Sequence, residues 1–330
     1  MDPSIASAFL PLENELLHDV RVVVSGSVTL NGNGQFGVGG ITPHQRWQDV
    51  SIGGDLTLNG TSVLLVSGGE TNQTVNYETG AAWLKVGGTF ALNDTSRFVP
   101  QSERYTGGSV KVVCRRFAVA EGARVDALRR GFGLYQLREV STLAPGATPG
   151  EITAGRYNYG FEYAPIHPGS PRGSYNLGYS SGGGLIRIHA ETMEIAGTLD
   201  ASCGDPTGSD YGHGSASGGG IWLTSAKQIE FAGTPSLLAG SYKTKYGDST
   251  MGTGGRIAIT HSPDRGVIDQ LAHTGTNPRV VRKDVGLVAF TNEFQNVTVN
   301  IDRSVDGSCA VKPGTFHYAP VPHGLMIMVR

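Results

Sequence analysis

Short runs of alternating apolar and polar residues recur along the chain, and a glycine or an Asn-Gly pair follows many of them. In the first half, residues 20–24, 50–52, 83–86 and 110–113 have this form. A period of two predicts a β-strand with one buried face, and the Asn-Gly pairs predict tight corners. We expect the Asn and Ser residues at equivalent corners to form stacked hydrogen-bonded ladders rather than a ligand site. The pattern predicts about seven stacked coils around one core.

Three glycine runs in the second half each lead directly into an apolar strand. Their last glycines are Gly184, Gly220 and Gly255, so an alignment on these residues spaces the repeats 36 and 35 residues apart. Residues 193–201 and 229–237, after the first two strands, also align. A fixed period of this size is typical of a repeat array, because one unit cannot bury its apolar side alone. We predict an all-β fold: a right-handed parallel β-helix, or β-solenoid, with one long loop insertion and a C-terminal β cap.

The repeat pattern also sets the expected domain boundaries. The parallel β-helix covers residues 20–290, with an N-terminal cap at residues 1–19 and C-terminal strands or a cap at residues 291–330. An insertion at residues 131–181 interrupts the alternation with prolines and tyrosines. The apolar strand at residues 325–329 leaves two alternatives: it pairs back to close the β-helix, or it joins a neighbouring subunit in self-assembly or a further domain downstream.

Composition narrows the classes of partner. Glycine supplies 49 of 330 residues, roughly twice the usual share, which suits sharp corners and closely stacked backbones. The net charge is −2 and only 16% of residues are charged, so we expect no nucleic-acid partner, which would require clustered lysine and arginine. The basic pairs Arg115-Arg116 and Arg129-Arg130 are expected at solvated edges rather than in a patch for an anionic ligand. No apolar run approaches the roughly 20 residues needed to cross a bilayer, so no membrane span is expected.

The insertion is the first candidate for a ligand-binding segment, because long loops on a rigid scaffold commonly carry function. Tyrosine rings stack on sugars, and the Arg, Glu and His side chains among them hydrogen-bond to hydroxyls, so the mixture suits a saccharide. Alternatively, the aromatic residues fold the loop back and shield one flank of the β-helix. A second polar loop follows Cys203. The candidate ligand-binding residues in the two loops are Tyr157, Tyr159, Glu162, Tyr163, His167, Arg172, Tyr211 and His213.

The sequence gives little support for a metal site or for redox-active cysteines. The Asp and Gly residues of the second loop are a weak signal for calcium, because they lack the repeated ligand spacing of a calcium site. We expect no cofactor, and calcium is the one ion left open. Cys114, Cys203 and Cys309 have no CxxC spacing. One disulfide with a spare thiol and a set of buried thiols both remain open. Four Asn-x-Thr sequons are weak evidence for glycosylation in a chain rich in Asn and Thr; they begin at Asn59, Asn72, Asn93 and Asn296.

Cationic side chains on the strands are the candidates for catalysis. A polysaccharide lyase needs a base near the proton it removes and a cation beside the adjacent carboxylate. Lys85 and Lys111 lie on neighbouring predicted strands, Arg187 and His189 share one strand face, and Arg256 is expected to stack above Arg187. Such residues on the solvent face of a sheet commonly serve only solubility. No catalytic residue is assigned, because the chain has no repeated Asp/Glu cluster and no Walker or HExxH motif.

The segment order between residues 150 and 260 resembles the glycine-rich repeat region of large bacterial surface and secreted proteins. The resemblance is carried by Tyr163-Ala164-Pro165, residues 182–188, Leu199-Asp200-Ala201-Ser202, residues 218–223 and residues 254–259, with Cys203 in place of the usual turn glycine. It implies a parallel β-helix at the cell exterior and brings no catalytic motif with it.

Together these features predict an extracellular or cell-surface β-solenoid. Its expected role is structural, adhesive or polysaccharide-binding, and its expected partners are polysaccharides or components of the cell envelope. The alternative is a β-helix polysaccharide lyase or glycoside hydrolase that acts on an acidic polysaccharide; fold alone does not decide between them.

Overall fold

The computed structural model describes the parts of the chain that form the stacked strands. The described residues are 19–39, 47–69, 82–104, 107–132, 165–170, 172–173, 179–203, 216–240, 254–261, 281–283, 297–300 and 315–319. They form strands, turns and extended segments, and no helix occurs among them. In this described part of the chain there is accordingly no helix long and apolar enough to span a membrane.

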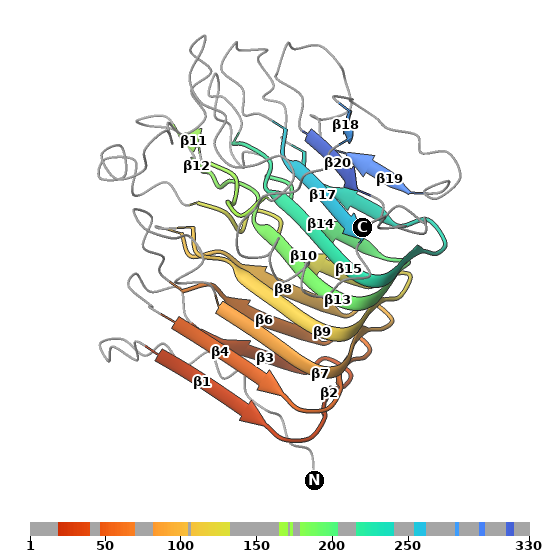
Figure 1. Ribbon diagram of the computed structural model, residues 1–330. Helices are drawn as coiled ribbons and strands as arrows, with labels where there is room; N and C mark the ends of the chain where they lie inside the picture. Colours follow the sequence, from red (N-terminus) through yellow and green to blue (C-terminus); the bar gives the residue numbers. More distant parts are fainter. Residues whose placement is uncertain are drawn as a thin grey trace, which may run out of the picture.

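Two large sheets run side by side along the stack (Figure 1). In spatial order, the first is β1 (Asp19–Val24), β4 (Trp47–Ile52), β7 (Ala82–Leu92), β9 (Val110–Val119), β13 (Leu185–Ile195), β15 (Gly220–Phe231), β17 (Arg256–His261), β20 (Thr315–Ala319) and β18 (Val281–Lys283). The second is β3 (Gln35–Val38), β6 (Val63–Ser67), β8 (Arg97–Gln101), β10 (Arg124–Asp126), β14 (Thr198–Asp200), β16 (Ser236–Leu238) and β19 (Thr298–Asn300). β2 (Val28–Leu30) and β5 (Leu56–Leu58) extend the first sheet beside β7, and β11 (Arg172–Gly173) pairs with β12 (Tyr179–Ser180).

Each successive unit of the chain adds a strand to each sheet, and neighbouring strands run parallel. The exceptions among the described pairs are β11 with β12 and β18 with β20, which are antiparallel. Parallel strands in stacked sheets without helices confirm the predicted all-β parallel architecture and are compatible with a β-solenoid. β19 and β20 continue the two sheets by pairing in parallel with β16 and β17. The domain boundaries stay a prediction, and residues 325–329 lie outside the described residues.

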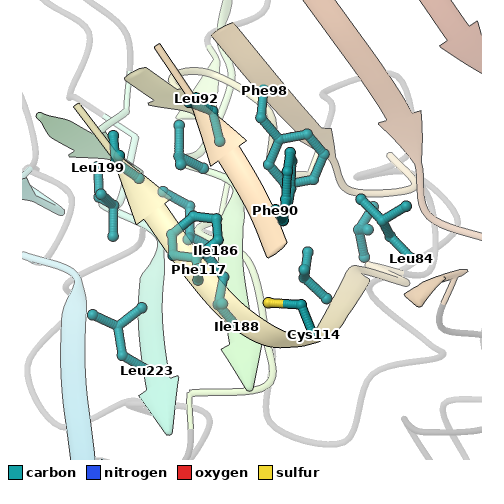
Figure 2. Packing of buried hydrophobic residues seen from close by; sticks show 14 of the residues in the cluster. Leu84, Phe90, Leu92, Phe98, Cys114, Phe117, Ile186, Ile188, Leu199 and Leu223 are labelled. Carbon is teal, nitrogen blue, oxygen red and sulfur yellow. The ribbon is translucent and has the colours of Figure 1, made fainter. Parts of the chain in front are cut away.

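The core between the sheets consists of the alternate residues of each strand, as the pattern predicts. Its largest members are fully buried, and the rings of Phe90, Phe98 and Phe117 pack edge to face between the strands (Figure 2), with centroids 5.2 Å and 5.5 Å from Phe90 to the other two. Such aromatic pairs contribute about 0.5–1.5 kcal/mol beyond the area that they bury. Cys114 lies in the same core, and Cys203 is also buried; neither forms a disulfide. Cys309 lies outside the described residues.

The predicted asparagine ladder is confirmed at the corners of the first three units. Asn59 Nδ2 donates to Asn31 Oδ1 over 2.8 Å, and Asn93 Nδ2 donates to Asn59 Oδ1 over 2.8 Å. Asp94 next to the ladder accepts a hydrogen bond from the backbone N of Gly60, whose φ of 68° is favourable for glycine. The ladder gives the asparagine side-chain amides at these corners hydrogen-bond partners in the neighbouring units.

The glycine alignment proposed above is wrong by one residue at the start of β15. Gly220 is the Cα partner of Leu185 and of Arg256, so Gly219, rather than Gly220, is equivalent to Gly184. The spacing over this first half of the repeat is therefore 35 residues. The second half follows the predicted register, with Met193 opposite Ile229. A β-bulge after Ala190 takes up the difference, and Ser225 Oγ stabilises it through hydrogen bonds to Gln228 O and Glu191 O.

The glycine runs are required where backbones of adjacent units approach one another. A Cβ atom on Gly183 would lie 1.9 Å from Ala201 O, and one on Gly218 would lie 1.9 Å from Ala239 O. Both carbonyl oxygens accept backbone hydrogen bonds, from Gly219 N over 2.8 Å and from Gly255 N over 2.7 Å. Only a residue without a side chain fits beside an interstrand hydrogen bond at this separation.

Candidate functional site

A row of aromatic and cationic residues crosses the outer face of the first sheet. The Cα partners along the row are Asp49, Trp83, Lys111, Arg187 and Trp222, one each from β4, β7, β9, β13 and β15. From Trp83 to Trp222 the residues on either side of each member in its strand belong to the core, as does Val50 beside Asp49, so the row faces away from the core. Parallel strands lie roughly 4.8 Å apart, so successive side chains of the row are in contact distance.

A second row lies two residues further along each strand. It includes Ser51, Lys85, His189 and Thr224, with Val113 between Lys85 and His189. We refer to the cationic and aromatic members of the two rows as the cation–aromatic face; it consists of Trp83, Lys85, Lys111, Arg187, His189 and Trp222.

Cation–π contacts organise this face. The ammonium groups of Lys85 and Lys111 lie 5.2 Å and 4.4 Å from the ring centroid of Trp83. The guanidinium of Arg187 lies 4.7 Å from the centroid of Trp222. Each contact contributes about 0.5–2 kcal/mol, most where water is excluded. Lys85 also forms an ion pair with Asp49 over 3.3 Å, so a carboxylate is already bound at one cation of the face.

His189 connects the two rows. Its ring meets Trp222 edge to face with centroids 5.4 Å apart, and its Nδ1 shares a 2.5 Å hydrogen bond with Thr224 Oγ1. The residues that the sequence placed together, Arg187 and His189, therefore do lie on one face. Arg256 does not stack above Arg187, because the correct register puts Ala258 beside Trp222 and pairs Arg256 with Gly220.

Exposure divides the cation–aromatic face into two halves. Arg187, His189 and Trp222 are 3%, 5% and 1% exposed, so the expectation that Arg187 and His189 lie on a solvent face is wrong. Lys111, between Trp83 and Arg187, is also buried, at 3%. At the other end, the Lys85 side chain is 47% exposed and Trp83 is half-buried. A ligand from solution can reach the Trp83–Lys85 half, whereas the Arg187–Trp222 half is part of the packed structure.

Residues 165–170 of the insertion cover part of the buried half. Ile166 packs against Trp222 and Ala258, and a Cβ on Gly220 would lie 3.0 Å from Pro165 Cβ. Backbone hydrogen bonds anchor this segment, from Gly169 N to Gly183 O over 2.7 Å and from Ser217 N to Ser170 O over 3.0 Å. This part of the insertion shields one flank of the sheet, which is one of the two roles expected for it.

Of the eight predicted ligand-binding residues, only His167 has a described side chain. It is half-buried, and burial lowers its pKa to about 4, with a smaller contribution from the positive charge of Arg256. His167 is therefore neutral at physiological pH. Arg172 belongs to β11, and its side chain is not described. Outside the described residues lie Tyr157, Tyr159, Glu162, Tyr163, Tyr211 and His213.

Sequence reasoning did not select Trp83 and Trp222, which organise the face. Each occupies a position where the alternation of its strand places an outward residue. A tryptophan at an outward position next to lysine or arginine two residues away, or on a neighbouring strand, is the signal that identifies them.

The comparisons with known proteins found no family model, no curated protein and no solved structure that matches this chain.

Proposed function

We propose that the chain is a right-handed parallel β-helix at the cell exterior, with a structural or adhesive role, that binds acidic polysaccharide at the Trp83–Lys85 half of the cation–aromatic face. The right hand is the one that parallel crossover connections adopt almost always. The cell-exterior location rests on the resemblance of the glycine-rich repeats.

One observation carries the binding proposal: Trp83 and Lys85 lie on an accessible part of the sheet, and Lys111, which is itself only 3% exposed, adds a second positive charge beside the indole. The indole is an apolar surface for a sugar ring, and the lysines supply positive charge beside it at 5.2 Å and 4.4 Å. Asp49 pairs with Lys85, so a carboxylate of the ligand must compete with Asp49 for this ammonium group. A uronic-acid polymer combines sugar rings with carboxylates at a regular spacing.

The burial of the remaining cations favours binding over catalysis. A lyase would bring a base and a cation to the same substrate sugar, and the groups best suited to those roles, His189 and Arg187, are 5% and 3% exposed. The contacts of Arg187 with Trp222 and of His189 with Thr224 stabilise the packing of the sheet, and they do not leave the two side chains open to a substrate.

Affinity electrophoresis through gels that contain polygalacturonate or neutral dextran tests the proposal. We expect retardation by polygalacturonate alone, weakened by raised salt because the charges are exposed. Lys85→Gln should reduce the retardation. The matched control is Lys227→Gln, which removes an exposed lysine paired with Glu191 on β13. Equal retardation of both variants and the parent protein would contradict the proposed site.

A second assay separates binding from turnover. Incubation with polygalacturonate should leave the ultraviolet absorbance unchanged, since no unsaturated product forms. A steady rise in absorbance would replace the binding proposal with the lyase alternative.

A further inference from the structure

The chain contains three Asn-Gly pairs, and all three lie at the corners of the first two units, where the asparagine ladder begins. They are Asn31-Gly32, Asn33-Gly34 and Asn59-Gly60. Such a pair is chemically labile, because glycine has no Cβ atom to keep its backbone nitrogen away from the side-chain amide of the preceding asparagine. The three pairs have different hydrogen-bonding surroundings, so they differ in this lability.

Two of the three glycine nitrogens are held by an acceptor. Gly60 N donates to Asp94 Oδ2 over 2.7 Å, and Gly34 N donates to Asn31 O over 3.1 Å. In the part of the chain that the structure describes, Gly32 N has no acceptor. The register of the ladder explains the difference. The residue after the ladder asparagine is Asp94 in the third unit but Gly60 in the second, and Gly60 has no side chain that could accept a hydrogen bond from Gly32 N.

The side chain of Asn31 is the end member of the ladder. Its Oδ1 accepts a hydrogen bond from Asn59 Nδ2 over 2.8 Å, and this oxygen is the one that becomes negative when a nitrogen attacks Cγ of Asn31. Its Nδ2 donates no hydrogen bond to the described residues, and both Asn31 and Gly32 are exposed. Asn59, in contrast, is stacked on both sides, because its Oδ1 accepts from Asn93 and its Nδ2 donates to Asn31.

Space for the attack is also present at this corner. Nothing lies within 4 Å of a Cβ atom built on Gly32, so neighbouring atoms do not obstruct movement of its nitrogen towards Cγ of Asn31. At Gly60 the same atom would lie 2.8 Å from Gly32 O, so the second corner is tightly packed against the first.

We infer that Asn31 is a site of spontaneous deamidation, and that the fold protects Asn33 and Asn59 from the same reaction. Gly32 N forms a bond to Cγ of Asn31, the bond between Cγ and Nδ2 breaks, and the amide leaves as ammonia with the proton of Gly32 N. Water then opens the five-membered imide at either of its carbonyl groups, which gives aspartate or isoaspartate. Both products add a negative charge to the exposed corner, and isoaspartate also adds a methylene group to the backbone. The inference does not depend on the proposed polysaccharide site.

Peptide mapping by mass spectrometry, after incubation of the protein in mildly alkaline buffer, tests this site. In the folded protein we expect Asn31 to convert about ten-fold faster than Asn59, the factor that corresponds to one hydrogen bond between the attacking nitrogen and a carboxylate. Asn33 should also convert more slowly than Asn31. In urea the protecting hydrogen bonds are lost, so the three asparagines should convert at similar rates.

The variant Asp94→Gly gives a second readout. It removes the acceptor of Gly60 N, and glycine suits the φ of 57° that Asp94 adopts. Conversion of Asn59 should then rise towards that of Asn31, which should itself stay unchanged. Glu121→Gln is the matched control, because Glu121 is an exposed carboxylate at the next corner and should affect neither rate.

Three outcomes would overturn the inference. They are the absence of conversion at Asn31, equal conversion of Asn31 and Asn59 in the folded protein, and the same order of rates in urea as in the folded protein. The last of these would show that the local sequence, rather than the hydrogen bonds of the fold, sets the rates.

Discussion

Substitution of Gly219 by alanine tests why the repeats contain glycine runs. A Cβ atom there would lie 1.9 Å from Gly184 O and 2.6 Å from Gly183 O, in a region where contacts below 3.0 Å essentially never occur. The closest pair must therefore separate by at least 1.1 Å, the difference between 3.0 Å and 1.9 Å. Gly184 O accepts the hydrogen bond of Gly220 N over 3.0 Å, and Gly219 N donates to Ala201 O over 2.8 Å. A shift of that size disrupts one or both bonds.

The expected cost follows from these two effects. A buried hydrogen-bonding group left unsatisfied costs about 1–3 kcal/mol, and overpacking of a close contact costs a further 1–3 kcal/mol, approximately. Gly219→Ala should therefore lower the free energy of unfolding by about 2–6 kcal/mol. The φ of Gly219 is not among the positive values, so the effect is steric and does not arise from backbone strain.

Gly26→Ala is the matched control, because nothing lies within 4 Å of a Cβ at Gly26 and its φ is also not positive. It should change stability by less than about 0.5 kcal/mol. Urea unfolding followed by circular dichroism measures both variants against the parent protein. If the free energies of unfolding of Gly219→Ala and Gly26→Ala differ by less than about 1 kcal/mol, roughly the error of such comparisons, the close-packing explanation is wrong.

Three further predictions concern single side chains. The pKa of His167 falls from 6.5 to about 4 on folding, so the unfolded chain binds the proton first as the pH falls. The contribution of this residue to stability is complete above pH 6.5 and is lost by pH 4, about 3 kcal/mol in all, and His167→Gln should flatten the stability profile in that window. Burial raises the pKa of Cys114 to about 12, so iodoacetamide at pH 8 should not modify Cys114 in the folded protein, as judged by peptide mass spectrometry, whereas urea should expose it. Asn59→Ala interrupts the ladder between Asn31 and Asn93 and should cost about 1–3 kcal/mol in urea unfolding; a cost equal to that of an exposed surface substitution would show that the ladder does not stabilise the fold.

The strands, the core face and the asparagine ladder could be predicted because each follows from a local pattern. Alternation around Leu84 and Val112 identifies the buried side chains, and an Asn-Gly corner repeated at Asn31 and Asn59 places the two amides one above the other. The register at Gly184 could not be predicted in the same way. A glycine run allows several equivalent alignments. The bulge after Ala190 then restores the expected register in the second half of β13.

The candidate site was predictable only in part for a similar reason. Alternation alone puts Arg187 and His189 on one face, and this is confirmed. Their burial depends on contacts with Trp222, which lies 35 residues after Arg187 and in turn packs against Ile166 of the insertion. No local pattern contains that information, so two buried residues were expected in solvent.

The location of polysaccharide binding is the central claim, and covalent capture tests it directly. Oligogalacturonate activated with carbodiimide and N-hydroxysuccinimide, then freed of excess reagent, acylates the lysines beside which its carboxylates bind. Peptide mass spectrometry should find the adduct on Lys85, with much less on Lys227, although the Lys227 side chain is 67% exposed and that of Lys85 is 47% exposed. Labelling that follows exposure alone, with Lys227 modified more than Lys85, would contradict the account.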